Sequence, residues 1–273
     1  MTPYPILLFD ADNTLFNFDA GNRRAFSEVC RSCHLPNTDE LFRTYEQANT
    51  EMWSAFDRGE CTKDFLVVER FRLFLERAGL QADPVLCNSI HLDTLKTNTV
   101  LLPHALEVCR TLAESHRLYI VTNAVAAVQK ARLAASDIHP YICDAFISEE
   151  AGASKPSVAY FDYVFSRIPG ITRENCLLIG DSPSSDLRGA NNYDIPCCWY
   201  NPQGLTRPEG LRIDYEIRDL PELLPIVFFY VSYIIIVCRT PRSPPDGRIL
   251  PPVRAGGRDT PHRRRTWPRW GSP

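Results

Sequence analysis

Short apolar runs recur along the chain, and the first of them ends abruptly in polar residues. Residues 6–9 read Ile-Leu-Leu-Phe and lead directly into Asp-Ala-Asp-Asn-Thr. An unbroken apolar run of this length is typical of a strand that is buried on both faces, as strands are in parallel sheets. Similar runs occupy residues 118–121, 145–147, 176–179 and 197–199, and helix-period segments lie between most of them. This alternation predicts an α/β fold with a Rossmann-like parallel sheet and right-handed crossover connections.

The region from residue 17 to residue 96 breaks the alternation. It contains three or four amphipathic helical segments and no convincing strand. One segment begins near Thr62 and stops at Gly79, a residue type that commonly ends helices. We therefore expect a core domain formed by residues 1–16 and 97–227, and an all-α domain formed by residues 17–96 and inserted after the first strand.

The composition changes sharply after residue 227. Residues 228–237 are almost entirely apolar, and the segment from there to residue 273 is rich in proline, arginine and glycine. The apolar run is shorter than the roughly 20 residues that a membrane span needs. The final segment lacks the apolar content of a folded core. We expect residues 228–273 to be disordered or a non-native extension, and a tail anchor or a nucleic-acid-binding arm remain as alternatives.

Composition and charge limit the classes of function. With 273 residues and 44% hydrophobic content, the chain can bury one large core together with a smaller domain. The net charge of −3 is unevenly distributed, because nine arginines and two aspartates give residues 239–273 a net charge of +7 and leave −10 for residues 1–238. An acidic main domain gives no electrostatic reason to expect nucleic-acid binding. No membrane partner is expected unless the tail is an anchor.

The ten cysteines do not indicate a secreted disulfide scaffold in a chain of this length. The first residues also lack the basic and apolar regions of a signal peptide. These features favour a cytoplasmic protein with reduced thiols. Cys30 and Cys33 form a CxxC pair, but no second pair with zinc spacing accompanies them. We interpret them as small apolar residues of a helix rather than as a metal or redox site.

Polar side chains with catalytic potential follow four of the predicted strands. Because the carboxyl ends of the strands line one crevice in an open α/β sheet, residues far apart in the sequence are expected to meet there. Each cluster alone would be a weak signal, since such residues also cap helices or face solvent. The clusters are Asp10, Asp12 and Thr14; Thr122 and Asn123; Lys155; and Asp181 and Asp186.

Together these residues satisfy the requirements of phosphoryl transfer from a monoester. Asp10 can attack phosphorus in line, and Asp12 can protonate the leaving oxygen and later deprotonate water. Mg²⁺ needs only one or two carboxylates besides substrate phosphate, and Asp10 and Asp181 can supply them, with a backbone carbonyl near Asp12 as a third ligand. Asp181 as a helix N-cap is the structural alternative.

The phosphate group needs its own ligands. The hydroxyl of Thr122 and the backbone amides around Asn123, at the start of a helix, can bind phosphate oxygens. Lys155 can neutralise the developing charge as a point cation. We therefore expect a small-molecule phosphate monoester as the partner and Mg²⁺ as the cofactor.

In this order the residues resemble the haloacid dehalogenase-like (HAD) hydrolase superfamily. Its four motifs correspond to residues 10–15, 121–123, 155–156 and 180–186, and the resemblance covers about residues 4–227. It implies an α/β HAD fold in which the helical insertion is a C1-type cap over the substrate. The implied roles are Asp10 as the nucleophile that forms an aspartyl-phosphate, Asp12 as acid and base, Thr122 and Lys155 as phosphate ligands, Asp181 as a magnesium ligand, and Asp186 as a support for Lys155 or the metal.

Within the superfamily the chain is most similar to the noncanonical-pyrimidine 5′-nucleotidases. That resemblance rests on residues 15–19, 53–60, 70–71, 148–152, 161–165 and 198–202. It implies a nucleotide as the substrate and a cap that reads the nucleobase. We predict Trp53, Phe56 and Arg58 as the cap residues that contact the base, by stacking or hydrogen bonding, and their alternative role is to form the core of the cap helix.

Three other functions share parts of this residue pattern. A phosphatase for another small metabolite, such as a sugar phosphate or phosphoglycolate, would differ from a nucleotidase only in the residues of its cap. A dehalogenase would use Asp10, but it has no leaving oxygen to protonate and therefore no need for Asp12. A non-catalytic interaction protein on the same scaffold is the alternative from a different class, although every catalytic residue is present.

Overall fold

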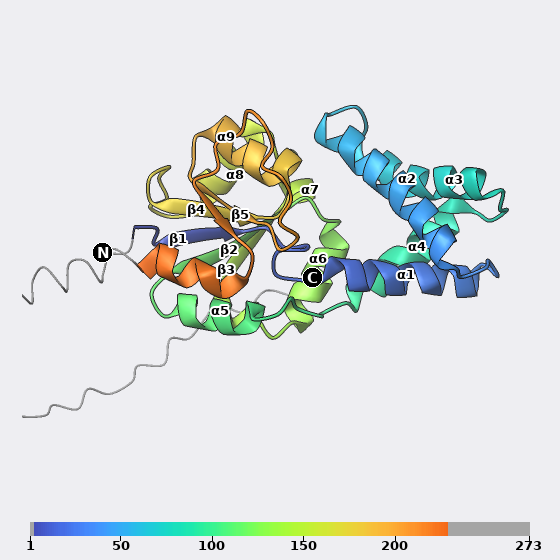
Figure 1. Ribbon diagram of the computed structural model, residues 1–273, viewed down its shortest axis with the longest axis horizontal. Helices are drawn as coiled ribbons and strands as arrows, with labels where there is room; N and C mark the ends of the chain where they lie inside the picture. Colours follow the sequence, from blue (N-terminus) through green and yellow to red (C-terminus); the bar gives the residue numbers. More distant parts are fainter. Residues whose placement is uncertain (1–2, 229–273) are drawn as a thin grey trace, which may run out of the picture.

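The computed structural model describes residues 3–228. Of the predicted tail, residues 228–273, only residue 228 is described, and it belongs to a helix; the rest lies outside the described residues. Six parallel strands form one sheet in the order β3-β2-β1-β4-β5-β6, with β1 and β4 at its centre (Figure 1). The predicted α/β class and parallel sheet are confirmed. The strands are β1 (Ile6–Phe9), β2 (Arg117–Thr122), β3 (Ile142–Ile147), β4 (Cys176–Gly180), β5 (Cys197–Tyr200) and β6 (Tyr215–Ile217).

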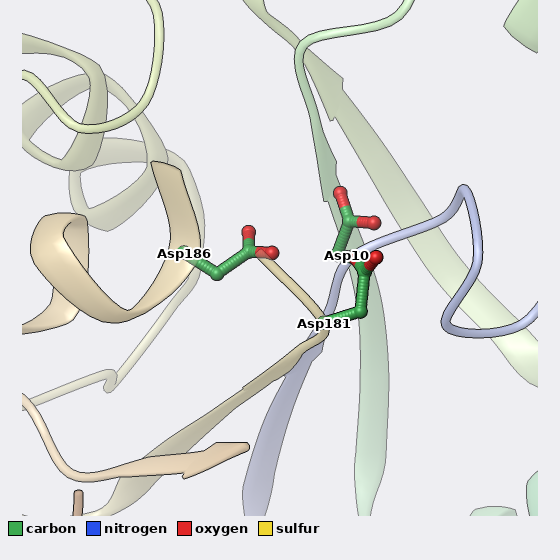
Figure 2. Close-up of side chains that lie close together, drawn as sticks. All are labelled: Asp10, Asp181 and Asp186. Carbon is green, nitrogen blue, oxygen red and sulfur yellow. The ribbon is translucent and has the colours of Figure 1, made fainter. Parts of the chain in front are cut away.

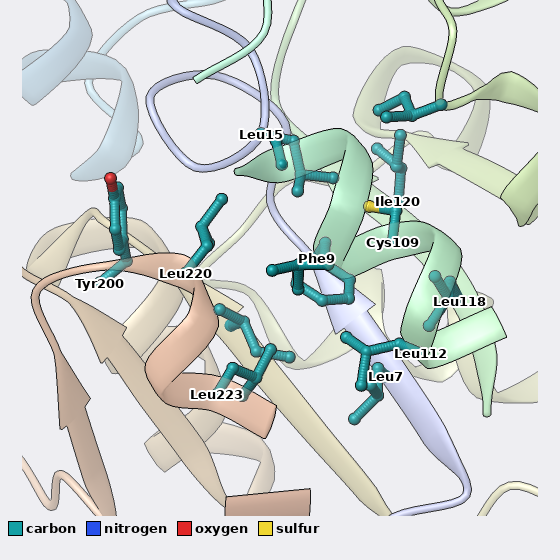
Figure 3. Close-up of a cluster of buried hydrophobic side chains, with 14 of the residues drawn as sticks. Leu7, Phe9, Leu15, Cys109, Leu112, Leu118, Ile120, Tyr200, Leu220 and Leu223 are labelled. Atoms are coloured by element: carbon teal, nitrogen blue, oxygen red, sulfur yellow. The ribbon is translucent and has the colours of Figure 1, made fainter. Parts of the chain in front are cut away.

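The apolar runs form strands because both faces of the sheet are covered. All four residues of β1 are fully buried. Leu7 and Phe9 face one side, where they pack with residues of α5 (Ala105–Ala113) and with Leu220 and Leu223 near the C-terminal end of the described chain (Figure 3). Their neighbours in β1 face a second apolar cluster with residues of α8 (Val158–Arg167) and α9 (Arg188–Tyr193). Alternate residues of one strand thus belong to opposite cores, as the pleat of a strand requires.

Nine α-helices and three short helical turns complete the described chain, and residues 223–228 are also helical. The helices are α1 (Phe18–Ser32), α2 (Asp39–Asp57), α3 (Lys63–Ala78), α4 (Pro84–Lys96), α5 (Ala105–Ala113), α6 (Ala126–Ala135), α7 (Ser148–Ala151), α8 (Val158–Arg167) and α9 (Arg188–Tyr193). The turns are η1 (His139–Tyr141), η2 (Pro183–Leu187) and η3 (Leu220–Glu222). None of the helices in residues 3–228 is long and apolar enough to cross a membrane.

Helices α1 to α4 follow β1 and form a separate group beside the sheet (Figure 1). Local signals in the sequence set their ends. The Thr62 hydroxyl accepts a hydrogen bond from the amide of Phe65 at the start of α3, and Gly79 ends the same helix at a φ of 64°. The group has its own aromatic core, in which Tyr45 stacks against Phe71 with ring centroids 5.1 Å apart. Residues 18–96 therefore contain helices and no strand, and the limits of a domain at residues 17 and 96 remain a prediction.

The CxxC pair lies at the end of α1. Cys30 is buried in the aromatic core of the helical group, and Cys33 is the C-cap residue that follows the last residue of α1. The sulfur of Cys33 lies 3.7 Å from that of Cys87, and all the cysteines that the structure describes are free thiols. The pair therefore packs as apolar residues of a helix end.

Candidate active site

The register of the sheet brings the predicted catalytic residues to one edge. Phe9, the last residue of β1, pairs with Ile120 of β2 on one side and with Ile179 of β4 on the other. The residues that follow these strands consequently meet at their carboxyl ends. A pocket of about 400 Å³ opens there between the sheet and helices α2, α3 and α4. The predicted residues that line it are Asp10, Asp12, Thr122, Asn123, Lys155, Asp181, Asp186 and Trp53.

Lys155 lies at the centre of the site, and its side chain is 1% exposed. Its Nζ donates hydrogen bonds to Oδ1 of Asp10 and to Oδ1 of Asp186, each at 2.6 Å, and to the carbonyl of Val121 at 2.9 Å. Burial alone would lower the pKa of Lys155, but the two carboxylates raise it above its ordinary value. Lys155 is therefore a fixed cation that holds Asp10 in place.

Asn123 positions this lysine through the backbone. Its amide nitrogen donates to the carbonyl of Lys155 at 2.9 Å, and its Oδ1 accepts from the amide of Lys155 at 3.0 Å. The side chain of Asn123 is thus occupied in joining two loops. Thr122 is buried, and its Oγ1 accepts a hydrogen bond from the amide of Ala124 at 3.1 Å. The hydroxyl proton of Thr122 remains available for a phosphate oxygen.

Three aspartates form a cluster of carboxylates that could hold a cation. One oxygen each from Asp10, Asp181 and Asp186 lies within 4.8 Å of the others, and Figure 2 shows the three side chains converging from separate segments. Burial, opposed by Lys155 and reinforced by Asp186, raises the pKa of Asp10 to about 7. Burial and the neighbouring carboxylates raise the pKa of Asp181 well above its usual value. Because Mg²⁺ prefers hard oxygen ligands and would offset this repulsion, the donor set fits that ion.

Two features of the chain fix the backbone around the aspartate cluster. A Cβ atom added to Gly180 would lie 2.4 Å from Oδ2 of Asp186, so only glycine leaves room for that carboxylate. The indole nitrogen of Trp199 donates to the carbonyl of Asp181 at 2.9 Å and fixes the loop after β4. The cluster includes Asp186, which we expected to support Lys155 or the metal, whereas the carboxylate of Asp12 lies outside it.

Asp12 pairs instead with an arginine that the sequence analysis missed. Oδ1 of Asp12 lies 2.6 Å from Nη2 of Arg132, a residue of α6 whose side chain is 1% exposed. The two groups form an ion pair rather than an aligned hydrogen bond. The signal that could have revealed Arg132 is its helical position, because Val128 and Leu133 on the same buried face predict that it points inward.

The inserted helices supply the opposite wall of the pocket. Asn49, Trp53 and Asp57 recur at intervals of four residues along α2, so they share one helical face and all line the pocket. Oδ2 of Asp57 accepts a hydrogen bond from the Ser184 hydroxyl at 2.6 Å, which connects this helix to the loop after β4. Burial raises the pKa of Asp57. A second unpredicted arginine, Arg70 of α3, lies in the same wall.

The other two predicted cap residues do not line this pocket. Phe56 packs edge-on against Trp53 with ring centroids 5.7 Å apart and lies under Nζ of Lys63. Arg58 follows the last residue of α2, is exposed, and pairs with Glu60 at 2.7 Å. Phe56, three residues after Trp53, lies beside that residue on the helix, so its contacts with Trp53 and Lys63 and not the helical period keep it out of the pocket, whereas Arg58 lies past the end of the helix.

Comparison with known proteins places this arrangement in a family. Residues 4–194 match the model of the haloacid dehalogenase-like hydrolase family. The HAD-hydrolase YfnB of Bacillus subtilis is 35% identical over 83% of this chain and 97% of its own length. A crystal structure of YfnB bound to magnesium has a TM-score of 0.79 and covers 82% of this chain and 98% of that one.

Two further relatives carry a named activity. The pyrimidine 5′-nucleotidase PynA of Streptococcus pneumoniae is 30% identical over 81% of this chain and 94% of its own length. The pyrimidine 5′-nucleotidase YjjG of Escherichia coli is 30% identical over 80% of this chain and 95% of its own length. The resemblance found in the sequence motifs is confirmed, and the chain belongs to the haloacid dehalogenase-like hydrolase family.

Proposed function

We propose that this hydrolase is a magnesium-dependent phosphatase that acts on nucleoside 5′-monophosphates, with a preference for pyrimidines, through an aspartyl-phosphate intermediate. The observation that carries the proposal is the position of Asp10. Its carboxylate is held by Lys155 at 2.6 Å and lines the same pocket as Asp12, below a wall of inserted helices. A nucleophile, a second carboxylate for proton transfer and a cation are thus available to one bound phosphate.

The two aspartates divide the reaction into two displacements. In the first, an oxygen of Asp10 attacks phosphorus while the bond to the leaving oxygen breaks, and Asp12 gives that oxygen its proton. In the second, Asp12 takes a proton from water as the water attacks the aspartyl-phosphate, which releases inorganic phosphate and restores Asp10. Lys155 stabilises the negative charge on the phosphoryl oxygens in both steps.

The carboxylates of Asp10, Asp181 and Asp186 would hold the magnesium ion. When bound, the ion supplies positive charge that reduces the repulsion between these carboxylates and substrate phosphate. Lys155 alone cannot supply this charge, because it already faces two of the three carboxylates. The relative YfnB, whose crystal structure is bound to magnesium, supports the same choice of metal.

The size and lining of the pocket support a nucleotide. Its volume of about 400 Å³ falls in the range of roughly 300–1,000 Å³ that is typical of small-molecule sites. Trp53 offers an aromatic surface beside the polar residues of α2, and aromatic side chains stack readily on nucleobases. The named activity of PynA and YjjG supports pyrimidine nucleotides in particular.

A panel of phosphate monoesters tests the proposal. The purified chain is incubated with Mg²⁺ and with pyrimidine and purine 5′-monophosphates, ribose 5-phosphate and phosphoglycolate, and phosphate release is measured. We expect the highest kcat/KM for a pyrimidine nucleotide and no release by Asp10→Asn. Asp93→Asn, which removes an exposed carboxylate from α4, is the matched control and should retain activity.

The outcomes separate the rival functions. No phosphate release from any substrate by the native chain would leave the non-catalytic scaffold as the better interpretation. A preference for ribose 5-phosphate or phosphoglycolate would contradict the nucleotidase assignment and keep the phosphatase. Release of halide from a 2-haloacid, with no release of phosphate, would instead favour a dehalogenase.

A further inference from the structure

Arg70 is a buried cation without a carboxylate partner. Its side chain comes from α3, and the residue is 2% exposed. Within residues 3–228 no acidic side chain forms an ion pair with it. Burying a charge that has no counter-ion is costly, so a folded protein that keeps one usually has a use for it.

The partners of Arg70 are all neutral acceptors. Its Nε donates to the carbonyl of Val67 at 3.1 Å, and Nη1 donates to Oδ1 of Asn49 at 2.9 Å. Its Nη2 contacts Oδ1 of Asn88 at 3.2 Å and Nδ1 of His91 at 3.3 Å. Guanidinium carries five N–H groups. These contacts account for four of them, and the fifth, on Nη1, has no acceptor in the described part of the chain.

His91 cannot neutralise the guanidinium. Burial, together with the charge of Arg70, lowers the pKa of His91 well below its ordinary value, so the imidazole is neutral. Its Nδ1 faces Arg70 as an acceptor, and its Nε2 lies 3.0 Å from Oδ1 of Asn22 and 3.1 Å from the hydroxyl of Tyr45. The network orients Arg70 and leaves its charge uncompensated.

Arg70 and Asn49 both line the pocket that contains Asp10. Because Oδ1 of Asn49 accepts from Arg70, its amide nitrogen is left as a donor, and this nitrogen has no acceptor among the side chains and backbone of residues 3–228. Trp53 lies one helical turn further along α2 and lines the same wall. The wall of inserted helices thus presents two donors, one of them charged, beside an aromatic ring.

We propose that Arg70 and Asn49 form a subsite for a hydrogen-bond acceptor on the leaving group of the substrate. For the substrate proposed above, this acceptor is a keto oxygen of the pyrimidine ring, while Trp53 packs against the base. The inference rests on the proposed function for the identity of the leaving group. Such a subsite discriminates strongly, because a substrate without the acceptor leaves buried donors unpaired.

A single substitution separates this role from a structural one. Asn49→Asp places a carboxylate next to Arg70, which supplies the missing counter-ion and occupies the donors. If Arg70 only organises the helical group, this variant keeps its activity and is as stable as the native chain or more so. If Arg70 is part of a subsite, KM of this variant for uridine 5′-monophosphate rises about 10- to 100-fold, as expected for the loss of hydrogen bonds to a charged group. Its kcat and KM with ribose 5-phosphate, which lacks a base, stay within about twofold of the native values.

Two controls and a second variant complete the experiment. Gln47→Glu adds the same charge to α2 at an exposed position outside the pocket, and Arg72→Met removes an exposed arginine from α3. Neither should change KM for uridine 5′-monophosphate. Arg70→Met should raise this KM like Asn49→Asp. An unchanged KM in Asn49→Asp, or an equal loss of activity with both substrates, would overturn the subsite.

The subsite and the proposed function can fail separately. If the native chain hydrolyses neither uridine 5′-monophosphate nor ribose 5-phosphate, the proposed function is wrong. Calorimetric titration of uridine 5′-monophosphate into the Asp10→Asn variant with Mg²⁺ then tests the subsite without catalysis. Binding that weakens about 10-fold or more on adding Asn49→Asp supports it, and absent or unaltered binding overturns it.

Discussion

Asp12 and Arg132 form an ion pair in the pocket that also contains Asp10, with 2.6 Å between Oδ1 of Asp12 and Nη2 of Arg132. The guanidinium also lies over the ring of Phe16, with its central carbon 4.5 Å from the ring centroid. Phe16 belongs to the same loop as Asp12. Arg132 therefore holds both the carboxylate and the loop that carries it, and in a phosphatase it would fix the direction in which Asp12 gives and takes its proton.

Replacing Arg132 tests this positioning role. Arg132→Met should lower kcat by about 10- to 100-fold, because proton transfer by a placed acid or base contributes roughly 10²- to 10⁴-fold and a misdirected carboxylate loses part of that. In the Asp12→Asn background the same change should have little further effect, since there is no proton transfer left to misdirect. Steady-state kinetics of both single variants and the double variant measure the coupling.

Lys130→Met is the matched control, since it removes an exposed cation from the same helix. It should leave kcat unchanged. An equal effect of Arg132→Met in both backgrounds would mean that the arginine acts on folding or on the whole pocket and not through Asp12. Arg132→Lys should recover only part of the activity, because an ammonium lacks the planar surface that packs on Phe16.

Lys155 is as important for the fold as for the site. Lys155→Met leaves the carboxylates of Asp10 and Asp186 close together and without their cation. Removing one partner of a buried ion pair typically costs about 3–5 kcal/mol, so we expect a lower free energy of unfolding in urea and no catalysis. Adding Asp186→Asn should restore part of the stability but no activity. Lys96→Met, at an exposed ion pair of α4, should change neither quantity.

The sheet and the aspartates of the pocket were predictable because their signals are local. A continuous apolar run followed by polar residues marks both the strand and the edge at which Asp10 and Asp181 lie, and the parallel register then brings those ends together. Helix caps such as Thr62 and Gly79 act within a few residues, so the ends of α3 were predictable too. The three-residue strand β6 carries too short a pattern to be recognised.

The residues that the sequence analysis missed depend on contacts between distant segments. Arg132 and Arg70 lie on the buried faces of α6 and α3, but a long charged side chain on such a face usually extends to solvent, and only contacts with other segments show that these two stay buried. The rotation of α2 also had to be known before Trp53 could be separated from Phe56. The sequence of a helix does not show which of its side chains face a pocket and which face solvent or a neighbouring helix.

The aspartate cluster predicts that Mg²⁺ stabilises the fold. A cation bound only to the native state adds RT ln(1 + [Mg²⁺]/Kd) to the free energy of unfolding, about 2.7 kcal/mol at 100 times Kd. The thermal midpoint should therefore rise with the logarithm of the Mg²⁺ concentration, measured at constant ionic strength. Asp181→Asn should remove most of the increase, while Asp93→Asn should retain it. The same increase in Asp181→Asn would place the metal elsewhere.

His91 predicts that mild acid weakens the helical group. Its pKa is depressed in the folded chain by burial and by Arg70, whereas in the unfolded chain it returns to about 6.5. Above that pH both states hold a neutral imidazole and the group has no effect. As the pH falls below about 6.5, the unfolded state takes up a proton on His91 that the folded state does not. The free energy of unfolding therefore drops by up to about 1.4 kcal/mol per pH unit until the pKa of His91 in the folded chain is reached.

Denaturant unfolding between pH 7.5 and 5 measures this slope. His91→Gln removes the titrating group, so its free energy of unfolding should fall less steeply with decreasing pH than that of the native chain, whatever its stability at pH 7.5. His116, whose pKa is also lowered by burial, and the carboxylates contribute equally to both proteins and cancel in the difference. His139→Gln, at an exposed position, should keep the native slope. If native and His91→Gln chains lose stability in parallel, the pKa of His91 is the same in the folded and unfolded chains, and the imidazole then takes up its proton in the fold beside Arg70.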